Sequence, residues 1–372
     1  MLIRRFIMEE WLASYKDICR YNLGESGAPG ITVGDLLARA GETPDVLGSI
    51  ALIDHDTRGT ERLRAAIAAT YSRDVFPETV TVTTGTSEAL FILFNLLLAD
   101  RRAAVLPFPA FQALYEIPRA LGAEVRFYHL TPENGYIPDP DEIAGLIDDR
   151  TGVVVINTPH NPSGVALPAM HAEAIVACAE HHGATVLFDE HYRFLPLDGD
   201  SPSSSFACPE RGVLATGSLT KCFGVVGLRV GWVAAPPRII RAVRDFRDYL
   251  THTLSPVSDY IAACALEERE RFIPPVIAAI RENVAAMGKF IAAHPRWSWA
   301  VPDGGVVAFP GYEYAVDSDT FARNLIQRHG VFVLPGSAFE TEGRIRVNLS
   351  QPPALFREAL DHIADYCRTL ER

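Results

Sequence analysis

Residues 218–232 have the sequence SLTKCFGVVGLRVGW, an apolar and glycine-rich run that contains one lysine, Lys221. The chain has 34 lysines and arginines in total, but only Lys16, Lys221 and Lys289 are lysines. Arginine stays protonated, whereas a lysine removed from water can lose its proton and attack a carbonyl carbon. A lysine at a strand end can also simply extend its ammonium to solvent. This stretch alone is therefore compatible with both a chemical and a structural role.

The composition is that of a globular protein, with 372 residues, 48% hydrophobic and 22% charged. This length allows two domains, or one large domain with a smaller one. The net charge of −12 argues against nucleic acid or an anionic membrane as a partner.

The six cysteines are widely spaced and contain no C-x-x-C pair, which indicates neither a metal site nor a disulfide framework. Free thiols of this kind fit the reducing cytoplasm, where we expect the protein to be located. The short apolar run at the N-terminus is followed by Glu9 and Glu10, so we predict no signal peptide. No apolar run reaches the length of a membrane span.

From residue 59 onward, predicted strands and helices alternate. The runs at 153–157, 185–189 and 212–217 are apolar throughout, which is typical of parallel strands covered on both faces. A strand at 230–235 is expected to be antiparallel or to lie at an edge. The other predicted strands of this region are 79–83, 103–107 and 123–129, and its predicted helices are 60–71, 89–98, 110–121 and 139–147.

The pattern of predicted elements changes toward the C-terminus, where short strands and longer helices predict a smaller α+β unit. We expect strands at 298–302, 305–310, 331–335 and 344–349, and helices at 236–250, from 256, 273–294, 318–329 and 353–370. The helix at 273–294 contains Pro274 and Pro275, which predict a break near that pair. The expected organisation is an arm at 1–50, a large domain at 51–265 and a small domain at 266–372. The arm is expected to contribute to the small domain and to the active site.

Ligands of parallel α/β sheets bind beyond the carboxyl ends of the strands. Five predicted strands are followed there by polar or aromatic groups, within residues 85–87, 107–111, 158–164, 189–192 and 218–221. Gly85, Thr86 and Ser87 open a helix, where backbone N–H groups and the helix dipole favour an anion. Ser218 and Arg229 could close around the same anion. The alternative for Thr86 and Ser87 is an ordinary helix N-cap.

The remaining groups suit an aromatic ring with a nitrogen and an oxygen. Asp189 at the end of a buried strand needs a cation, such as a protonated ring nitrogen, or it caps the next helix. Tyr192 and Asn161 could bind a phenolic oxygen, or could be a core tyrosine and a turn residue. Phe111 could stack on the ring or simply pack. With the amine of Lys221, these groups describe a site for pyridoxal 5′-phosphate (PLP).

The sequence resembles the fold-type I PLP-dependent enzymes of aminotransferase class I/II, from about residue 59 to residue 349. The most specific motif is S-x-[ST]-K-x-F-G-x-x-G-x-R-x-G-W at 218–232; N-P-[ST]-G at 161–164 and D-E-x-Y at 189–192 follow the expected order. The resemblance implies an α/β fold with a mainly parallel central sheet in the large domain, and an α+β small domain. It also implies a homodimer with PLP as cofactor and an amino acid as substrate.

The same resemblance implies a role for each site residue. Lys221 would form the Schiff base, and Asp189 would bind the pyridine nitrogen. Asn161 and Tyr192 would bind the ring oxygen, and Phe111 would stack on the ring. Arg346 would bind the substrate α-carboxylate, and the phosphate site would consist of Gly85, Thr86, Ser87, Ser218 and Arg229. Many relatives give a tyrosine to the phosphate of the partner subunit. Residues 53–59 contain none, which leaves open whether a partner completes the phosphate site.

PLP makes the Cα–H bond of an amino acid acidic, and Lys221 is the natural base for that proton. Transamination, racemisation and β-elimination all share this step. Segments 26–30 and 247–256 resemble family members that cyclise 3-hydroxy-L-arginine in antibiotic biosynthesis. In that reaction the β-hydroxyl leaves, and a guanidino nitrogen then adds to Cβ.

The hypothesis of cyclisation places the substrate near Ser26, Gly27 and Asn161. Glu25 is the first candidate for the guanidinium, although it is also compatible with a solvated loop charge. The main alternative is a conventional aminotransferase that acts on an amino acid and a keto acid. A regulatory protein that retains the fold without catalysis is a further alternative, but we expect no room in the chain for its usual DNA-binding domain.

Overall fold

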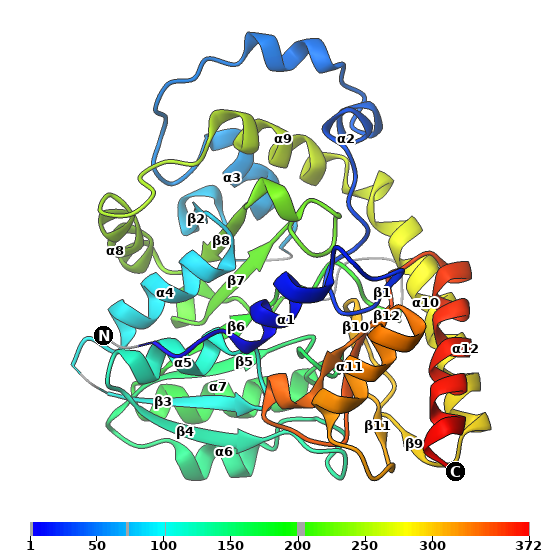
Figure 1. The fold of residues 1–372 in the computed structure, drawn as a ribbon. Coiled ribbons are helices and arrows are strands. Elements are labelled where there is room, and N and C mark those ends of the chain that lie inside the picture. The colour runs from blue at the N-terminus through cyan, green and yellow to red at the C-terminus, as the bar shows by residue number, and fades with distance from the viewer. Residues whose placement is uncertain (1–2, 72–73, 101, 199–204, 372) are drawn as a thin grey trace.

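The computed structural model describes residues 3–71, 74–100, 102–198 and 205–371. In these residues the largest sheet has seven strands in the order β2-β8-β7-β6-β5-β3-β4 (Figure 1). Its strands are β2 (Val80–Thr83), β3 (Ala103–Phe108), β4 (Glu124–His129), β5 (Thr151–Asn157), β6 (Thr185–Asp189), β7 (Leu214–Ser218) and β8 (Gly231–Ala234). Strand β8 pairs antiparallel with both of its neighbours, β2 and β7, and the other neighbouring strands pair in parallel. The predicted α/β class is confirmed, and of the two alternatives given for the strand at 230–235 the antiparallel one holds, because β8 lies between β2 and β7 rather than at an edge.

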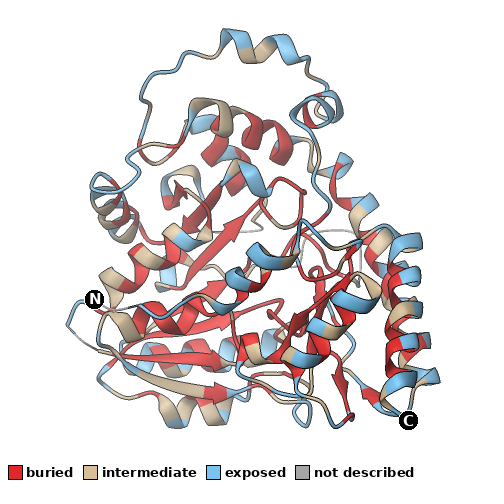
Figure 2. Cartoon of the chain, in the orientation of Figure 1, coloured by how far each residue is buried: buried red, intermediate tan, exposed pale blue. Residues whose placement is uncertain are grey.

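Both faces of the sheet are covered, which explains its continuous apolar runs. Along β5, Val153 and Val155 join one apolar cluster with residues of α4, α5 and α8, while Val154 and Ile156 join a second cluster with residues of α7. Figure 2 shows most of these strands as buried, whereas the edge strand β4 is largely intermediate or exposed. The helices around the sheet are α3 (Glu61–Ala68), α4 (Thr86–Leu97), α5 (Ala113–Ala120), α6 (Pro140–Leu146), α7 (Ala169–His181), α8 (Pro237–Arg247) and α9 (Pro256–Glu267).

The C-terminal part contains smaller sheets and three helices. Strands β10 (Val307–Ala308), β14 (Ile345–Asn348) and β13 (Leu334–Pro335) form an antiparallel sheet, and β9 (Trp297–Ser298) pairs with β11 (Gly311–Tyr312). The predicted helices 318–329 and 353–370 are confirmed as α11 (Ser318–His329) and α12 (Pro353–Leu370). The predicted strands 298–302 and 305–310 are too long.

The predicted break near Pro274 and Pro275 is wrong, because α10 (Ile273–Ala293) is continuous. Both prolines lie in its first turn. Backbone N–H groups in the first turn have no acceptor within the helix, so a proline there removes none of the helical hydrogen bonds. None of the helices in the described ranges combines the length and the apolar composition that a membrane crossing needs.

The N-terminal arm contains α1 (Ile7–Tyr15), β1 (Tyr21–Asn22) and α2 (Val33–Arg39), and crosses the middle of the molecule in Figure 1. Strand β1 pairs in parallel with β12 (Val331–Phe332). Leu23 continues the contact, donating from its N–H to the Phe332 carbonyl and accepting from the Asn348 N–H, both at 2.8 Å. A Cβ atom at Gly24 would lie 2.4 Å from the Phe332 ring, so only glycine fits this close approach.

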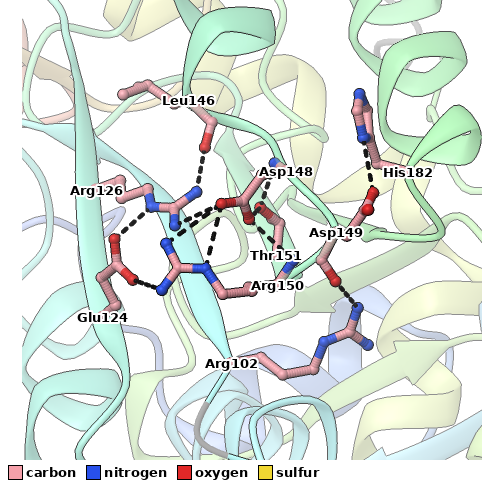
Figure 3. A network of polar contacts seen from close by, with 9 residues as sticks. All are labelled: Arg102, Glu124, Arg126, Leu146, Asp148, Asp149, Arg150, Thr151 and His182. Carbon is pink, nitrogen blue, oxygen red and sulfur yellow. Dashed lines mark hydrogen bonds and ion pairs between the residues drawn. The ribbon is translucent and has the colours of Figure 1, made fainter.

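The starts of β4 and β5 are joined by charged side chains (Figure 3). Arg126 contacts Glu124 at 2.8 Å and Asp148 at 3.0 Å, and Arg150 contacts the same two carboxylates. The Arg126 guanidinium holds the pKa of Asp148 well below its usual range. This network lies at the amino ends of the parallel strands, away from the edge at which ligands bind, and its charges compensate one another.

Candidate active site

A cavity of about 770 Å³ contains groups from the carboxyl ends of the parallel strands and from the arm. Ten of the predicted site residues line it: Glu25, Ser26, Gly27, Thr86, Ser87, Phe111, Asn161, Asp189, Lys221 and Arg229. The other four, Gly85, Tyr192, Ser218 and Arg346, are not in its lining, but Gly85, Tyr192 and Arg346 contact residues that are. Ser218 ends β7 and contacts the lining residue Thr220 through its hydroxyl at 2.9 Å. The structure therefore brings the predicted residues together in one place.

Lys221 lies three residues beyond the end of β7 and extends into the cavity. Its Nζ donates a hydrogen bond to Ser26 Oγ at 3.1 Å. Burial lowers the pKa of Lys221 to about 8; the Arg346 guanidinium acts in the same direction, and the Glu9 carboxylate opposes both. An amine with this pKa is partly neutral at physiological pH, which suits a nucleophile or a general base.

The Asp189 carboxylate is buried and already has several donors. Thr216 Oγ1 donates to Oδ1 at 2.9 Å, Asn157 Nδ2 donates to Oδ2 at 3.2 Å, and His191 Nδ1 lies 3.2 Å from Oδ2. The position of Asp189 at a buried strand end predicts a cation opposite it, whereas these three neighbours are a finding of the structure. Since a carboxylate accepts about four hydrogen bonds, Asp189 can take one more donor from the cavity that it lines.

The predicted anion site lies at the start of α4. This helix begins at Thr86 rather than at the predicted residue 89, so Gly85 is its N-cap, with φ +77°. The first N–H groups of a helix have no partner within it, and Gly85 has no side chain to cap them. A Cβ atom at residue 85 would lie 2.6 Å from Arg229 Nη2, so the guanidinium lies directly against this turn. Thr86, Ser87 and Arg229 thus present donors on one side of the cavity.

Arg346 connects the cavity wall to the arm. Its Nη1 donates to Asn161 Oδ1 at 3.2 Å, and its Nη2 donates to the Gly24 carbonyl at 2.7 Å. Burial lowers the pKa of Arg346 to about 10. In the described part of the chain, Arg346 has no carboxylate partner and its buried Nε has no hydrogen-bond acceptor. A guanidinium buried in this way is costly unless it is paired, which suits a substrate carboxylate.

The arm also contacts the loop that carries Lys221. The Ala28 N–H donates to the Lys221 carbonyl at 2.7 Å, and the Ile31 N–H donates to the Gly224 carbonyl at 3.2 Å. Tyr192 Oη, which was predicted to face a ring oxygen, donates to the Ser26 carbonyl at 3.2 Å. These bonds make the arm a wall of the cavity.

Several lining or supporting residues were missed by the sequence argument. Asn157 and Thr216 flank Asp189 in the sheet register, so the alignment of strand ends could have revealed them. His191 lies within the D-E-x-Y motif that drew attention to its neighbours. Glu9 and Lys16 also line the cavity, but they come from α1, and no sequence signal indicates what that helix packs against.

These observations test whether PLP fits the site. A helix N-terminus with a guanidinium suits its phosphate, the Asp189 carboxylate suits a protonated ring nitrogen, and Phe111 lines the cavity beside them. An amine of lowered pKa suits its aldehyde. The fold and the cavity define a fold-type I PLP-dependent enzyme.

The comparisons with known proteins agree. The family model for aminotransferase class I and II matches residues 49–363, and the chain belongs to that family. A capreomycidine synthase from Streptomyces vinaceus is 33% identical, over 98% of this chain and 94% of that protein. The arginine–pyruvate transaminase AruH from Pseudomonas aeruginosa is 31% identical, over 83% of this chain and 81% of that protein.

Among solved structures, the PLP-dependent cyclase OrfR is similar, with a TM-score of 0.90 and 28% identity. The match covers 99% of this chain and 98% of that one. The chain is therefore a PLP-dependent enzyme, and PLP is its cofactor.

Proposed function

We propose that this enzyme cyclises 3-hydroxy-L-arginine to capreomycidine in antibiotic biosynthesis. The observation that carries the proposal is the extent of the match to capreomycidine synthase. That match covers 98% of the chain, so it includes most of residues 1–48, which the family model does not reach. Part of this segment forms a wall of the cavity. The match to the arginine transaminase leaves 17% of the chain uncovered.

When bound, PLP supplies an electron sink that makes the Cα–H bond of the substrate acidic. In the proposed reaction Lys221 takes the proton from Cα. The C–O bond at Cβ then breaks, and the hydroxyl leaves as water after gaining a proton. A guanidino nitrogen forms a bond to Cβ and loses a proton, and Lys221 returns a proton to Cα. The net change is the loss of one water and the closure of a six-membered cyclic guanidine.

In this proposal the other site residues hold the substrate and the cofactor and keep water away from the reacting carbon. We assign the substrate α-carboxylate to Arg346, whose guanidinium lacks a carboxylate partner among the described residues. Asp189 is assigned to the ring nitrogen of the cofactor. The arm, held at Ala28 and Ile31, shields the reacting carbon from water, which would otherwise add to Cβ in place of the guanidino nitrogen.

We also propose a homodimer. Leu52, Ile53 and Tyr249 are 79%, 69% and 91% exposed, which is unusual for large apolar side chains. Their two segments lie together, because His55 Nε2 lies 3.0 Å from the Leu254 carbonyl. Light scattering tests the proposal: a monomer for the native chain would contradict it. We further propose that residues 51–265 and 266–372 act as large and small domains with residues 1–50 as the arm, in a cytoplasmic enzyme.

The second candidate function is an aminotransferase for arginine, which the similarity to AruH favours. One experiment separates the two. The holoenzyme is incubated with 3-hydroxy-L-arginine and no keto acid, and the products are analysed by mass spectrometry. Cyclisation predicts a product lighter by one water that forms catalytically. A keto acid as the sole product, limited to one turnover per cofactor, would instead establish the aminotransferase.

A further inference from the structure

Two carboxylates of the arm line the cavity, Glu9 on α1 and Glu25 in the loop after β1. Their surroundings differ. Glu25 Oε2 accepts a hydrogen bond from Asn22 Nδ2 at 2.9 Å, and the Glu25 N–H donates to Asn22 Oδ1 at 3.2 Å. Glu9 has no hydrogen bond or ion pair to any described side chain. Of the two, Glu9 is thus the carboxylate without a partner among the described residues, whereas Glu25 already accepts one hydrogen bond.

The helix positions Glu9 toward the cavity. Met8, Glu9, Leu12 and Lys16 all line it, and they recur at the spacing of one helical face. The next residue, Glu10, is absent from the lining and contacts Arg5 Nε at 2.7 Å. Two acidic residues adjacent in sequence therefore differ in direction, which provides a matched pair for experiments.

Glu9 lies close to the groups assigned to the reacting end of the substrate. Its neighbour Met8 is buried, and Met8 Sδ lies 3.4 Å from Arg346 Nη1. This contact places the start of α1 directly over Arg346. Burial is the largest cause of the lowered pKa at both Arg346 and Lys221. The negative charge of Glu9 acts in the opposite direction and raises the pKa of each group. A substrate held between those two groups lies beside the Glu9 carboxylate.

We propose that Glu9 is the specificity residue that binds the guanidinium of the substrate side chain. The proposal rests on the proposed function only in taking an arginine-type substrate. A guanidinium presents N–H groups in a planar fork that matches a carboxylate, and such charge-assisted pairs are the strong ones. On this proposal Glu25, which accepts a hydrogen bond from Asn22 Nδ2, supports the loop rather than the substrate.

The test measures binding to the holoenzyme, without turnover, from changes in cofactor absorbance. The probes are L-arginine, which lacks a β-hydroxyl leaving group, and L-citrulline, its neutral counterpart of the same shape. Glu9→Gln is expected to weaken L-arginine binding about 10- to 100-fold, as for the loss of a hydrogen-bonded charge pair, and to change L-citrulline binding by less than about twofold. Glu9→Asp is expected to restore part of the preference.

The matched control is Glu10→Gln, which removes a carboxylate from the same helix outside the cavity and is expected to keep the wild-type preference. Loss of the preference in Glu25→Gln but not in Glu9→Gln would overturn the proposal. An equal loss of affinity for L-arginine and L-citrulline in Glu9→Gln would also overturn it, because a change in the structure of the cavity wall weakens the binding of both amino acids alike. A keto-acid product from 3-hydroxy-L-arginine would refute cyclisation yet leave the Glu9 assignment standing, so the two failures are distinguishable.

Discussion

The Lys221 ammonium donates a hydrogen bond to the Ser26 hydroxyl at 3.1 Å, and the backbone carbonyl of Lys221 accepts from the Ala28 N–H at 2.7 Å. Both the side chain and the main chain of the lysine are therefore held by the N-terminal arm. The arm lies outside the part of the chain that the family model matches, residues 49–363. The position of the reactive amine thus depends on a segment that is not part of the common family core.

Lys221→Ala is expected to slow exchange of the Cα proton of L-arginine by at least about 10²- to 10⁴-fold, because the base that moves this proton is lost. Exchange is measured in D₂O by NMR on protein reconstituted with PLP. Added methylamine is expected to restore part of the rate. Lys289→Ala, which changes an exposed lysine of α10, serves as the control. Full exchange in Lys221→Ala would contradict the assignment.

The lowered pKa of Lys221, about 8, predicts how cofactor capture depends on pH. The neutral amine is the nucleophile, so the rate at which cofactor-free protein captures PLP is expected to rise through about pH 8 and then level off. The same shift means that the unfolded chain holds a proton that the native state lacks between about pH 8 and the ordinary lysine pKa of 10.5. Stability of the cofactor-free protein therefore rises with pH in that window.

Stopped-flow absorbance follows the capture, and urea unfolding at several pH values follows the stability. Lys221→Ala is the control for both, since it removes the titrating group. A capture rate that keeps rising to about pH 10 would show that the pKa of the lysine is close to its ordinary value.

Thr216→Val is expected to lower the free energy of unfolding by about 1–3 kcal/mol, because the buried Asp189 carboxylate loses the donor at 2.9 Å. The matched control is Thr81→Val. Thr81 is equally buried in β2, but its hydroxyl has no hydrogen-bond partner among the described residues. That change is expected to be neutral or stabilising. Equal losses in urea unfolding for the two variants would show that the Thr216 hydroxyl does not support Asp189.

Gly85→Ala is expected to weaken PLP binding about tenfold or more, because the new methyl group displaces Arg229 from the start of α4. Gly122→Ala is the control. Gly122 has φ +80°, close to the +77° of Gly85, but a Cβ atom there meets no atom within 4 Å. Gly85→Ala is also expected to lose more stability than Gly122→Ala, because Gly85, with φ +77° and ψ 168°, lies in a region that is nearly exclusive to glycine. Equilibrium dialysis measures the PLP affinity, and equal affinities would refute the role of Arg229.

The central sheet and its strand-end groups could be predicted from sequence because each depends on local pattern. The apolar runs at 153–157 and 185–189 are continuous since both faces of β5 and β6 are covered. Lys221 and Asp189 follow such strands, and the crossover rule then places them at one edge. The predicted range of this helix, 89–98, began one turn late because residues 86–88 lack the apolar periodicity of the rest, although residues 85–87 were identified as its opening.

The arm could not be predicted in the same way. Periodicity can indicate a short amphipathic helix such as α1 (Ile7–Tyr15), but it does not identify the surface that the helix covers. Strand β1 has only two residues, and its partner β12 lies some three hundred positions away, so no local pattern announces their pairing. For this reason Glu25 was considered as a ligand of the guanidinium from sequence, whereas Glu9 emerged only from the cavity.

The pairing of β1 with β12 fastens the arm at one point, and the bonds to the Lys221 loop fasten it at another. The first thirty residues, which include Glu9 and are held at these two points, form a cassette laid over the reaction centre. On the proposed role of Glu9, substitutions within the first thirty residues are expected to change which amino acid is admitted, while Thr86, Ser87, Asp189 and Arg229 lie outside this segment. Grafting this cassette between relatives is a direct laboratory route to new substrate preferences on an unchanged chemical core.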